Sequence, residues 1–213
     1  MPILVTPDQI AHLAPSARSS YREAFERGEE VLARFEISAT PARLGHFMAQ
    51  LLHESGGLTI QFENLNYSAG RLPKVWPRRF RPIGPLDPAG YAHAPETLAN
   101  EVYGRRMGNN APGDGFKFRG RGLMQLTGRD SYAAATTRLR RAYLDTPDLT
   151  LDPDAVIRAD WCLKVAACEW SEKGCNALAD QDSIRSITKR INGGLIGLAS
   201  RMEWRRRTAA VWS

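Results

Sequence analysis

The sequence lacks the features of membrane-spanning and disulfide-rich proteins. No apolar run approaches the roughly 18 residues of a membrane-spanning helix, which argues against an internal helical anchor. There are only three cysteines, Cys162, Cys168 and Cys175. Their odd number and the absence of an export signal favour reduced thiols in the core over a disulfide framework. The gaps of five and six residues between them do not match the short cysteine pairs of a zinc site. We expect no metal and no other cofactor.

The N-terminus also lacks an export signal. The first ten residues, M-P-I-L-V-T-P-D-Q-I, contain no basic start followed by a sustained apolar stretch and a small-residue cleavage site. The protein is therefore expected to be made in the cytoplasm.

Acidic residues are fewer than basic ones. The chain has 23 Asp and Glu against 29 Lys and Arg, which gives a net charge of +6 at pH 7. Such a charge favours anionic partners through long-range attraction. Nucleic acid, an anionic membrane surface and the acidic bacterial cell wall all qualify, and charge alone does not choose among them.

The chain is long enough for one sizeable core, and we expect residues 1–213 to form a single domain. Helical patterns dominate and no alternation predicts a hairpin, so the fold should be mainly α, with at most a small β element near residues 58–75. Residues 1–39 should supply supporting helices for a core of residues 40–213. Helices are predicted over residues 7–14, 19–35, 95–103, 128–141, 153–170, 184–192 and 198–212, with a turn over 176–182.

One further helix organises the chain. Thr40 is a suitable N-cap, Pro41 suits the first helical position, and Gly56 and Gly57 provide the stop. An apolar stripe at helical spacing contains Leu44, Phe47, Met48, Leu51 and Leu52. The opposite, outer face is predicted to carry Arg43, His46, Gln50 and His53.

Two carboxyl groups stand near the end of this helix. Glu54 falls on the border of the apolar stripe, where partial desolvation favours the protonated form of a carboxyl. Glu63 follows nine residues later in a polar loop, F-E-N-L-N-Y-S, that favours the ionised form. One protonated and one ionised carboxyl are what glycosidic bond hydrolysis requires, although on spacing alone a solvated helix end is the default interpretation.

Four strings occur in order along the chain: H-E-S-G-G at 53–57, E-N-L-N-Y-S-A at 63–69, F-R-G-R-G-L-M-Q-L-T-G at 118–128 and I-N-G-G at 191–194. Together they resemble glycoside hydrolase family 19, the chitinase-like family that includes many bacteriophage endolysins. The short length and the second string are similar to the phage and bacterial lysozyme branch. The resemblance implies a lysozyme-like, two-lobed α-helical fold with a central cleft. It also implies an inverting reaction with Glu54 as general acid and Glu63 as general base.

The same resemblance assigns further residues to the site. It implies that Gln125 contacts substrate, that the Thr127 hydroxyl helps to hold the attacking water, and that Asn192 lines the cleft. The glycines after Asn192 fit a helix end equally well. Ser131 stands where family chitinases usually have Asn, which puts chitin binding in question.

Two residues of the second string are candidates for substrate contact from their chemistry. Asn66 carries an amide that can hydrogen-bond sugar hydroxyls, and Tyr67 carries a ring that can pack on an apolar sugar face. Holding the loop in place is an equal alternative for both side chains.

The predicted activity is that of an endolysin, a monomeric muramidase-like enzyme that cuts the β-1,4 glycan strands of bacterial peptidoglycan and binds no nucleic acid. Without an export signal, it would be made in the host bacterial cytoplasm and reach the wall through a holin-like pore. The last helix carries four arginines, Arg201, Arg205, Arg206 and Arg207. These arginines form either a solvated face or a surface that contacts an anionic wall or membrane. The alternatives are a chitinase with the same residues, a non-catalytic wall-binding protein and a nucleic-acid-binding protein.

Overall fold

Helices form nearly all of the regular structure in the computed structural model, which describes residues 1–213. The prediction of a mainly α fold is confirmed. The small β element expected near residues 58–75 is reduced to one bridge residue, Phe62, with no sheet, and a second isolated bridge joins Phe80 to Leu86. None of the helices combines the length and apolar character needed to cross a membrane.

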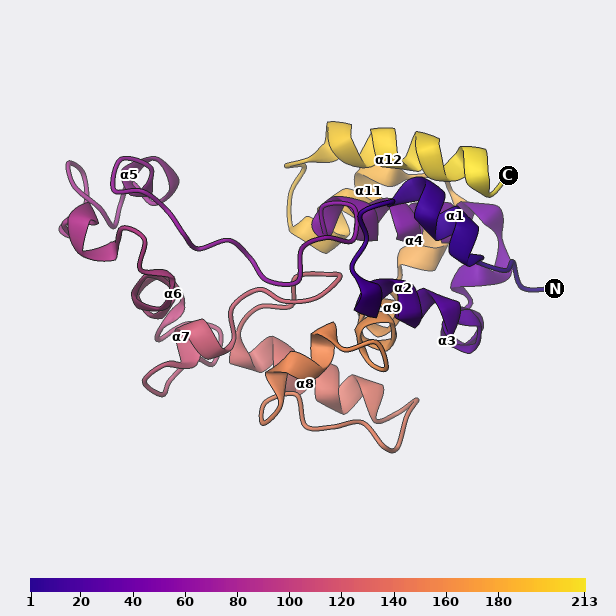
Figure 1. The fold of residues 1–213 in the computed structure, drawn as a ribbon, viewed down its shortest axis with the longest axis horizontal. Coiled ribbons are helices and arrows are strands. Elements are labelled where there is room, and N and C mark those ends of the chain that lie inside the picture. Colours follow the sequence, from indigo (N-terminus) through magenta and orange to yellow (C-terminus); the bar gives the residue numbers. More distant parts are fainter. The chain divides into compact units, whose positions relative to one another are not determined.

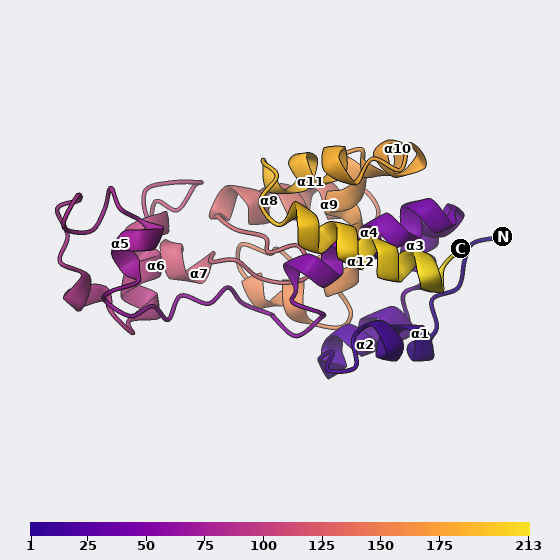
Figure 2. The same ribbon diagram turned by 90° about the horizontal axis from the view of Figure 1, so that it is seen from above.

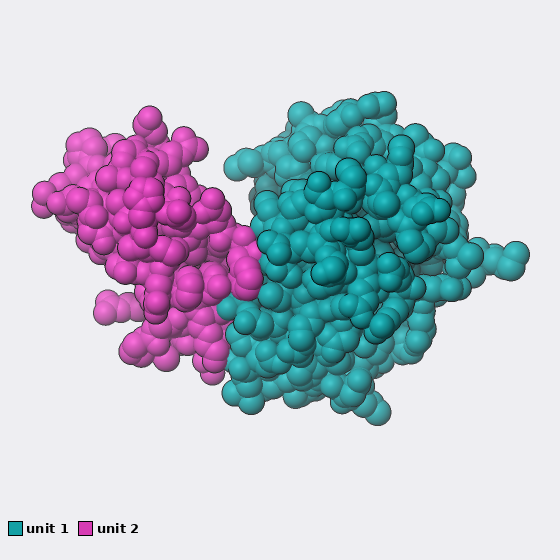
Figure 3. All heavy atoms as spheres, in the orientation of Figure 1, with its two compact units in different colours: residues 1–61, 121–125, 135–213 teal, residues 62–120, 126–134 magenta.

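The chain folds into two units (Figure 3). Unit 1 contains residues 1–61, 121–125 and 135–213, and unit 2 contains residues 62–120 and 126–134. Along the sequence, unit 2 therefore interrupts unit 1 twice. This division agrees with the two-lobed architecture that the resemblance implies, and the central cleft stays a prediction.

The helices of unit 1 come from both ends of the chain (Figure 1). They are α1 (Pro7–Leu13), α2 (Ser19–Glu26), α3 (Glu29–Arg34), α4 (Pro41–Glu54), α9 (Cys162–Glu172), α10 (Cys175–Asp180), α11 (Ile184–Asn192) and α12 (Leu198–Val211), with 3₁₀ turns η1 (Ile37–Ala39) and η3 (Pro153–Ile157). Unit 2 contains α5 (Leu72–Val75), η2 (Pro88–Tyr91), α6 (Pro95–Tyr103) and α7 (Asp114–Lys117). Helix α8 (Arg129–Leu139) begins in unit 2 and ends in unit 1.

Helix α4 begins and ends as its sequence predicts. The Thr40 hydroxyl accepts a hydrogen bond from the Arg43 backbone N–H at 3.2 Å, and Pro41 is the first helical residue. The helix ends at Glu54, before glycines whose positive φ values an ordinary residue rarely adopts. The prediction for its outer face was wrong: His46 and Gln50 are fully buried, because α12 packs along that face (Figure 2).

The core of unit 1 surrounds α4 and α9. Phe47 of α4 meets Trp170 of α9 edge to face, with ring centroids 5.4 Å apart. The prediction of core thiols is confirmed, since all three cysteines are buried and free. Burial raises the pKa of Cys162 and of Cys168 to about 12 and that of Cys175 to about 11. These thiols are therefore unreactive packing residues.

Three predicted elements of unit 1 were wrong in detail. The helix predicted over 19–35 breaks at Gly28, where an added Cβ would lie 2.5 Å from a Leu163 methyl, so the glycine permits close packing of α9. The helix predicted over 153–170 is divided into η3 and α9 by Arg158, whose backbone is extended. The turn predicted over 176–182 is largely helix α10, which begins after Gly174 at a φ of 63°.

Unit 2 has a smaller core around α6, which has the predicted bounds. Its buried residues are Leu65, Leu72, Phe80, Leu98, Ala99 and Val102. Helix α7, which the sequence did not reveal, packs on α6 through Gly115. A Cβ there would lie 2.5 Å from the Ala99 carbonyl oxygen, so only glycine allows the two helices to approach this closely. This core supports the loop that carries Glu63.

Candidate active site

Glu54 is held at the end of α4 by an arginine of α12. An Arg201 guanidinium nitrogen donates a hydrogen bond to Glu54 Oε1 at 2.6 Å, and another nitrogen donates to Gln50 Oε1 at 2.6 Å. The Glu54 side chain is 18% exposed, whereas that of Arg201 is almost fully buried. The partial burial predicted for Glu54 is therefore confirmed. Its buried cationic partner also fixes the carboxyl in one orientation.

The Arg201 contacts belong to a longer polar seam between α4 and α12. The Thr208 hydroxyl donates to the Gly45 carbonyl oxygen at 2.9 Å, and His53 Nδ1 lies 2.9 Å from the Ser200 hydroxyl. The seam runs the length of both helices, so buried polar groups fix their register. His53 thus contributes a contact to α12.

His46 forms the next part of this seam. Its Nε2 lies 2.7 Å from Asp182 Oδ1, which also accepts a hydrogen bond from Arg205 at 3.1 Å. Its Nδ1 is buried without a hydrogen-bond partner, so a second ring proton would have no acceptor. Burial lowers the pKa of His46, and the hydrogen bond with Asp182 opposes this shift only in part. His46 is therefore a neutral donor near pH 7.

Glu63 is held within unit 2 by two donors. The Gly120 backbone N–H donates to Glu63 Oε1, and the Tyr103 hydroxyl donates to Oε2 at 2.7 Å. The backbone N–H of Glu63 in turn donates to the Gly120 carbonyl oxygen at 3.0 Å. Donors to both oxygens are the arrangement that stabilises an ionised carboxylate. The two donors fix the position of both Glu63 oxygens.

Tyr103 is itself positioned by the loop that follows α6. The Asn109 side-chain amide donates to the Tyr103 carbonyl oxygen at 3.0 Å, and the Asn109 side-chain oxygen accepts from the Arg129 N–H at 2.9 Å. Burial, and next the hydrogen bond to Glu63, raise the pKa of Tyr103. The phenol therefore keeps its proton and remains a donor to Glu63.

The two candidates that follow Glu63 also hold the loop. Asn66 Oδ1 lies 2.8 Å from His93 Nδ1, and the Asn66 N–H donates to the Asn64 side chain at 2.8 Å. The Tyr67 ring meets Trp76 edge to face, with ring centroids 5.2 Å apart. The structural alternative given for both residues therefore has direct support, and substrate contact by either remains a prediction.

The string over 118–128 adopts a tightly constrained backbone. Gln125 has a φ of 50°, and its side-chain amide donates to the Gly122 carbonyl oxygen at 2.9 Å. Gly128 has a φ of 84°, and an added Cβ there would lie 2.5 Å from Met107 Cβ. The string thus fixes Thr127 on a rigid turn just before α8, where Ser131 occupies the first helical turn.

Asn192 is the last residue of α11, and Gly193 follows at a φ of 71° as the left-handed cap. The Asn192 amide donates to the Ile196 carbonyl oxygen at 3.3 Å, which bends the chain toward α12. The helix-end interpretation of I-N-G-G is confirmed. Because Asn192 is exposed, a substrate contact is compatible with this capping geometry.

The predicted site residues are divided between the two units. Unit 1 holds Glu54, Gln125 and Asn192, and unit 2 holds Glu63, Asn66, Tyr67, Thr127 and Ser131. The separation of roughly 6.5 to 9.5 Å that an inverting reaction requires between its two carboxyl groups stays a prediction.

Sequence reasoning missed the side chains that hold the two carboxyl groups. Arg201 has a sequence signal, because it shares the buried stripe of α12 with Thr208 and Trp212 at positions i, i+7 and i+11. An arginine on a buried stripe needs a buried acceptor. Tyr103 carries no such signal, since its contact joins residues 40 positions apart.

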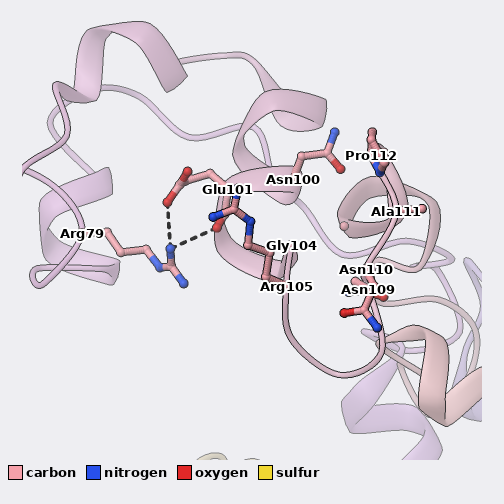
Figure 4. A pocket seen from close by; sticks show the side chains of 11 residues that line it. Arg79, Asn100, Glu101, Gly104, Arg105, Asn109, Asn110, Ala111 and Pro112 are labelled. Atoms are coloured by element: carbon pink, nitrogen blue, oxygen red, sulfur yellow. Dashed lines mark hydrogen bonds and ion pairs between the residues drawn. The ribbon is translucent and has the colours of Figure 1, made fainter.

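Unit 2 also contains a polar pocket of about 520 Å³ beside the end of α6 (Figure 4). Arg79 and Glu101 line it and form an ion pair at 2.8 Å. Asn100, Arg105 and Asn110 complete its polar rim. No group of three or more His, Cys, Asp and Glu side chains in the chain is arranged to hold a metal ion.

Comparisons with known proteins identify the family. A Haemophilus influenzae protein named as containing a glycosyl hydrolase family 19 domain is 41% identical over 158 residues, which cover 73% of this chain and 72% of that protein. No family model matches.

Solved structures of chitinases share the fold. Chitinase C from Streptomyces griseus superposes with a TM-score of 0.63 at 17% identity, over 98% of this chain and 76% of that one. A bacterial family 19 chitinase superposes with a TM-score of 0.58 at 20% identity, over 98% and 95% of the two chains. The identity to the Haemophilus influenzae protein shows that this chain belongs to glycosyl hydrolase family 19 and is a glycoside hydrolase.

Proposed function

We propose that this glycoside hydrolase cleaves the β-1,4-linked glycan of bacterial peptidoglycan, with Glu54 as general acid and Glu63 as general base. The observation that carries the assignment of roles is the contrast between the two carboxyl groups. Glu54 is mostly buried at a helix end, whereas Glu63 accepts hydrogen bonds at both oxygens from Gly120 and Tyr103. We assign the proton-donor role to Glu54, because its buried partner Arg201 stabilises the carboxylate left after donation, and the acceptor role to Glu63, because two donors hold its oxygens in place.

In the proposed reaction, Glu54 gives its proton to the glycosidic oxygen as the bond from this oxygen to the anomeric carbon breaks. A water attacks the anomeric carbon from the opposite face and loses a proton to Glu63, which inverts the configuration. Arg201 stabilises the Glu54 carboxylate that proton transfer creates, since its guanidinium lies 2.6 Å from Oε1. Solvent exchange then restores the starting protonation of both groups.

The preference for peptidoglycan rests on the chain's similarity to the lysozyme branch and on Ser131, which stands where family chitinases usually have Asn. We further propose that the protein acts on the cell wall as a monomer after release from the cytoplasm. Chitin is the second candidate substrate, favoured by the fold comparison, because the two solved structures are named as chitinases.

Mass analysis of soluble products separates the two substrates. Purified peptidoglycan and chitin are incubated in parallel with the wild-type chain and with Glu54→Gln. Products that end in reducing muramic acid, absent with Glu54→Gln, support a muramidase. Products that end in reducing glucosamine would show that the other glycosidic bond of the strand is cleaved. Cleavage of chitin alone would favour the chitinase, and no product from either substrate would contradict both candidate activities.

A further inference from the structure

The net positive charge of the chain is concentrated in unit 2. This unit contains ten Lys and Arg residues against six Asp and Glu, and residues 64–86 contain five Lys and Arg and no acidic residue. Four of these five cations are exposed and form no ion pair with the protein: Arg71, Lys74, Arg78 and Arg81. The fifth, Arg79, turns toward Glu101 and is neutralised by it (Figure 4). The exposed charges therefore attract a partner outside the chain.

An apolar residue stands among these cations. Ile83 is 74% exposed at the tip of a tight loop. The Arg81 N–H donates to the Leu86 carbonyl oxygen at 2.9 Å and the Gly84 N–H donates to that of Phe80 at 2.8 Å, so the loop has a defined shape. Phe80 is buried in the core of unit 2 and anchors the loop from beneath. We name Arg71, Lys74, Arg78, Arg81 and Ile83 the 71–83 patch.

The arginines of the last helix, by contrast, have contacts within the chain. Arg201 is buried on Glu54, Arg205 pairs with Asp182, and Arg206 pairs with Glu203. The remaining one, Arg207, donates to the Leu13 carbonyl oxygen and lies over the Trp204 ring. The prediction that Arg201 belongs to a surface patch is wrong, since it is buried. Residues 71–81, in contrast, carry four exposed cations that form no ion pair.

We propose that the 71–83 patch binds the surface of an anionic lipid bilayer. Exposed cations approach the anionic headgroups while the apolar tip inserts at the acyl boundary, which is the combination that interfacial binding requires. A nucleic acid fits the patch less well. Single-stranded binding needs aromatic rings free to stack on bases. Of the two aromatic residues of this segment, Trp76 packs edge to face on Tyr67 and Phe80 is buried.

Vesicle binding by the full-length chain tests the proposal. The partition constant is measured by co-sedimentation with vesicles of phosphatidylglycerol and phosphatidylethanolamine, and with phosphatidylcholine vesicles. Each cation near an anionic surface contributes about fivefold, so Arg78→Ala/Arg81→Ala should weaken binding to the anionic vesicles about 25-fold. Ile83→Ser should weaken it about tenfold. These side chains are exposed and hold no contact with the core, so the variants should fold like the wild type.

A matched control removes the same charge elsewhere. Arg185→Ala/Lys189→Ala deletes two exposed cations of α11 and should change binding less than threefold. Glycan hydrolysis should be unchanged in the three variants, so failure of this proposal is distinguishable from failure of the proposed function. Equal losses in the patch and control variants, or equal affinity for anionic and phosphatidylcholine vesicles, would overturn the proposal. So would binding to duplex DNA that is as tight as vesicle binding and insensitive to Ile83→Ser.

Discussion

Tyr103→Phe tests whether the donors around Glu63 matter to the reaction. The substitution removes one hydroxyl and keeps the ring that packs against the core of unit 2. It deletes the hydrogen bond to Glu63 Oε2, which is 2.7 Å long, and leaves the Gly120 N–H on the other oxygen. Glu63 then loses one of the two groups that fix its orientation.

The expected loss follows from the strength of a hydrogen bond to a charged group. Such bonds contribute about 1.5 to 3 kcal/mol, and each 1.4 kcal/mol corresponds to about tenfold in rate. Because the base acts on water rather than on the sugar, the loss should appear in kcat with little change in KM. We therefore expect kcat to fall about ten- to 100-fold.

The assay measures release of reducing ends at saturating substrate, with thermal unfolding as a check on the fold. Tyr143→Phe is the matched control, because the Tyr143 hydroxyl is buried without a hydrogen-bond partner in unit 1. It should leave kcat within about twofold of the wild-type value. A Tyr103→Phe variant with more than half of the wild-type kcat would refute the role given to this hydrogen bond, as would an equal loss in the control.

Three further outcomes follow from buried polar groups. Arg201→Ala leaves Glu54 and Gln50 without their buried partner, so the free energy of unfolding measured with urea should fall by about 3 kcal/mol. An unchanged urea midpoint would disprove the buried pairing. The folded pKa of His46 is below its unfolded value, so the unfolded chain binds more protons and the thermal midpoint should fall as pH drops below about 6.5. His46→Gln should make the thermal midpoint less dependent on pH in this range. The same pH dependence in the variant and the wild type would contradict the argument. The three cysteines should react with a thiol reagent only after unfolding in urea, and fast labelling of the folded chain would show that they are not buried.

Local signals in the sequence are sufficient to predict where the helices next to the candidate site begin or end. Thr40 and Pro41 predict the start of α4, and the glycine at position 193 predicts the end of α11, because caps act within one helical turn. The two carboxyl groups could be named for the same reason: Glu54 and Glu63 lie in short strings with recognisable neighbours.

Tertiary packing decides what the sequence did not reveal. His46 and Gln50 read as polar surface residues, yet α12 covers them with Arg201 and Arg205 from more than 150 positions away. The period of α4 cannot indicate that its polar side is buried, because burial depends on a helix at the other end of the chain. The break at Gly28, which the sequence did not predict, similarly depends on the approach of Leu163.

The two holders of the carboxyl groups differ in how far they could be foreseen. Arg201 lies on a buried stripe and could be found by asking which arginine of the last helix faces inward. Tyr103 gives no such sign, because its hydroxyl reaches Glu63 only through the fold of unit 2. The two candidate carboxyl groups could thus be predicted from the sequence more easily than the side chains that hold them.

The central claim is that Glu54 donates the proton that breaks the glycosidic bond. Its most direct test compares the rate of glycan cleavage by Glu54→Gln with that of the wild type, on whichever of peptidoglycan and chitin the wild type cleaves faster. The amide keeps a hydrogen-bond acceptor for Arg201, so stability should fall by only about 2 kcal/mol. The account predicts a loss of at least about 1,000-fold in rate in a folded variant. A folded Glu54→Gln variant that cleaves at near the wild-type rate would contradict it.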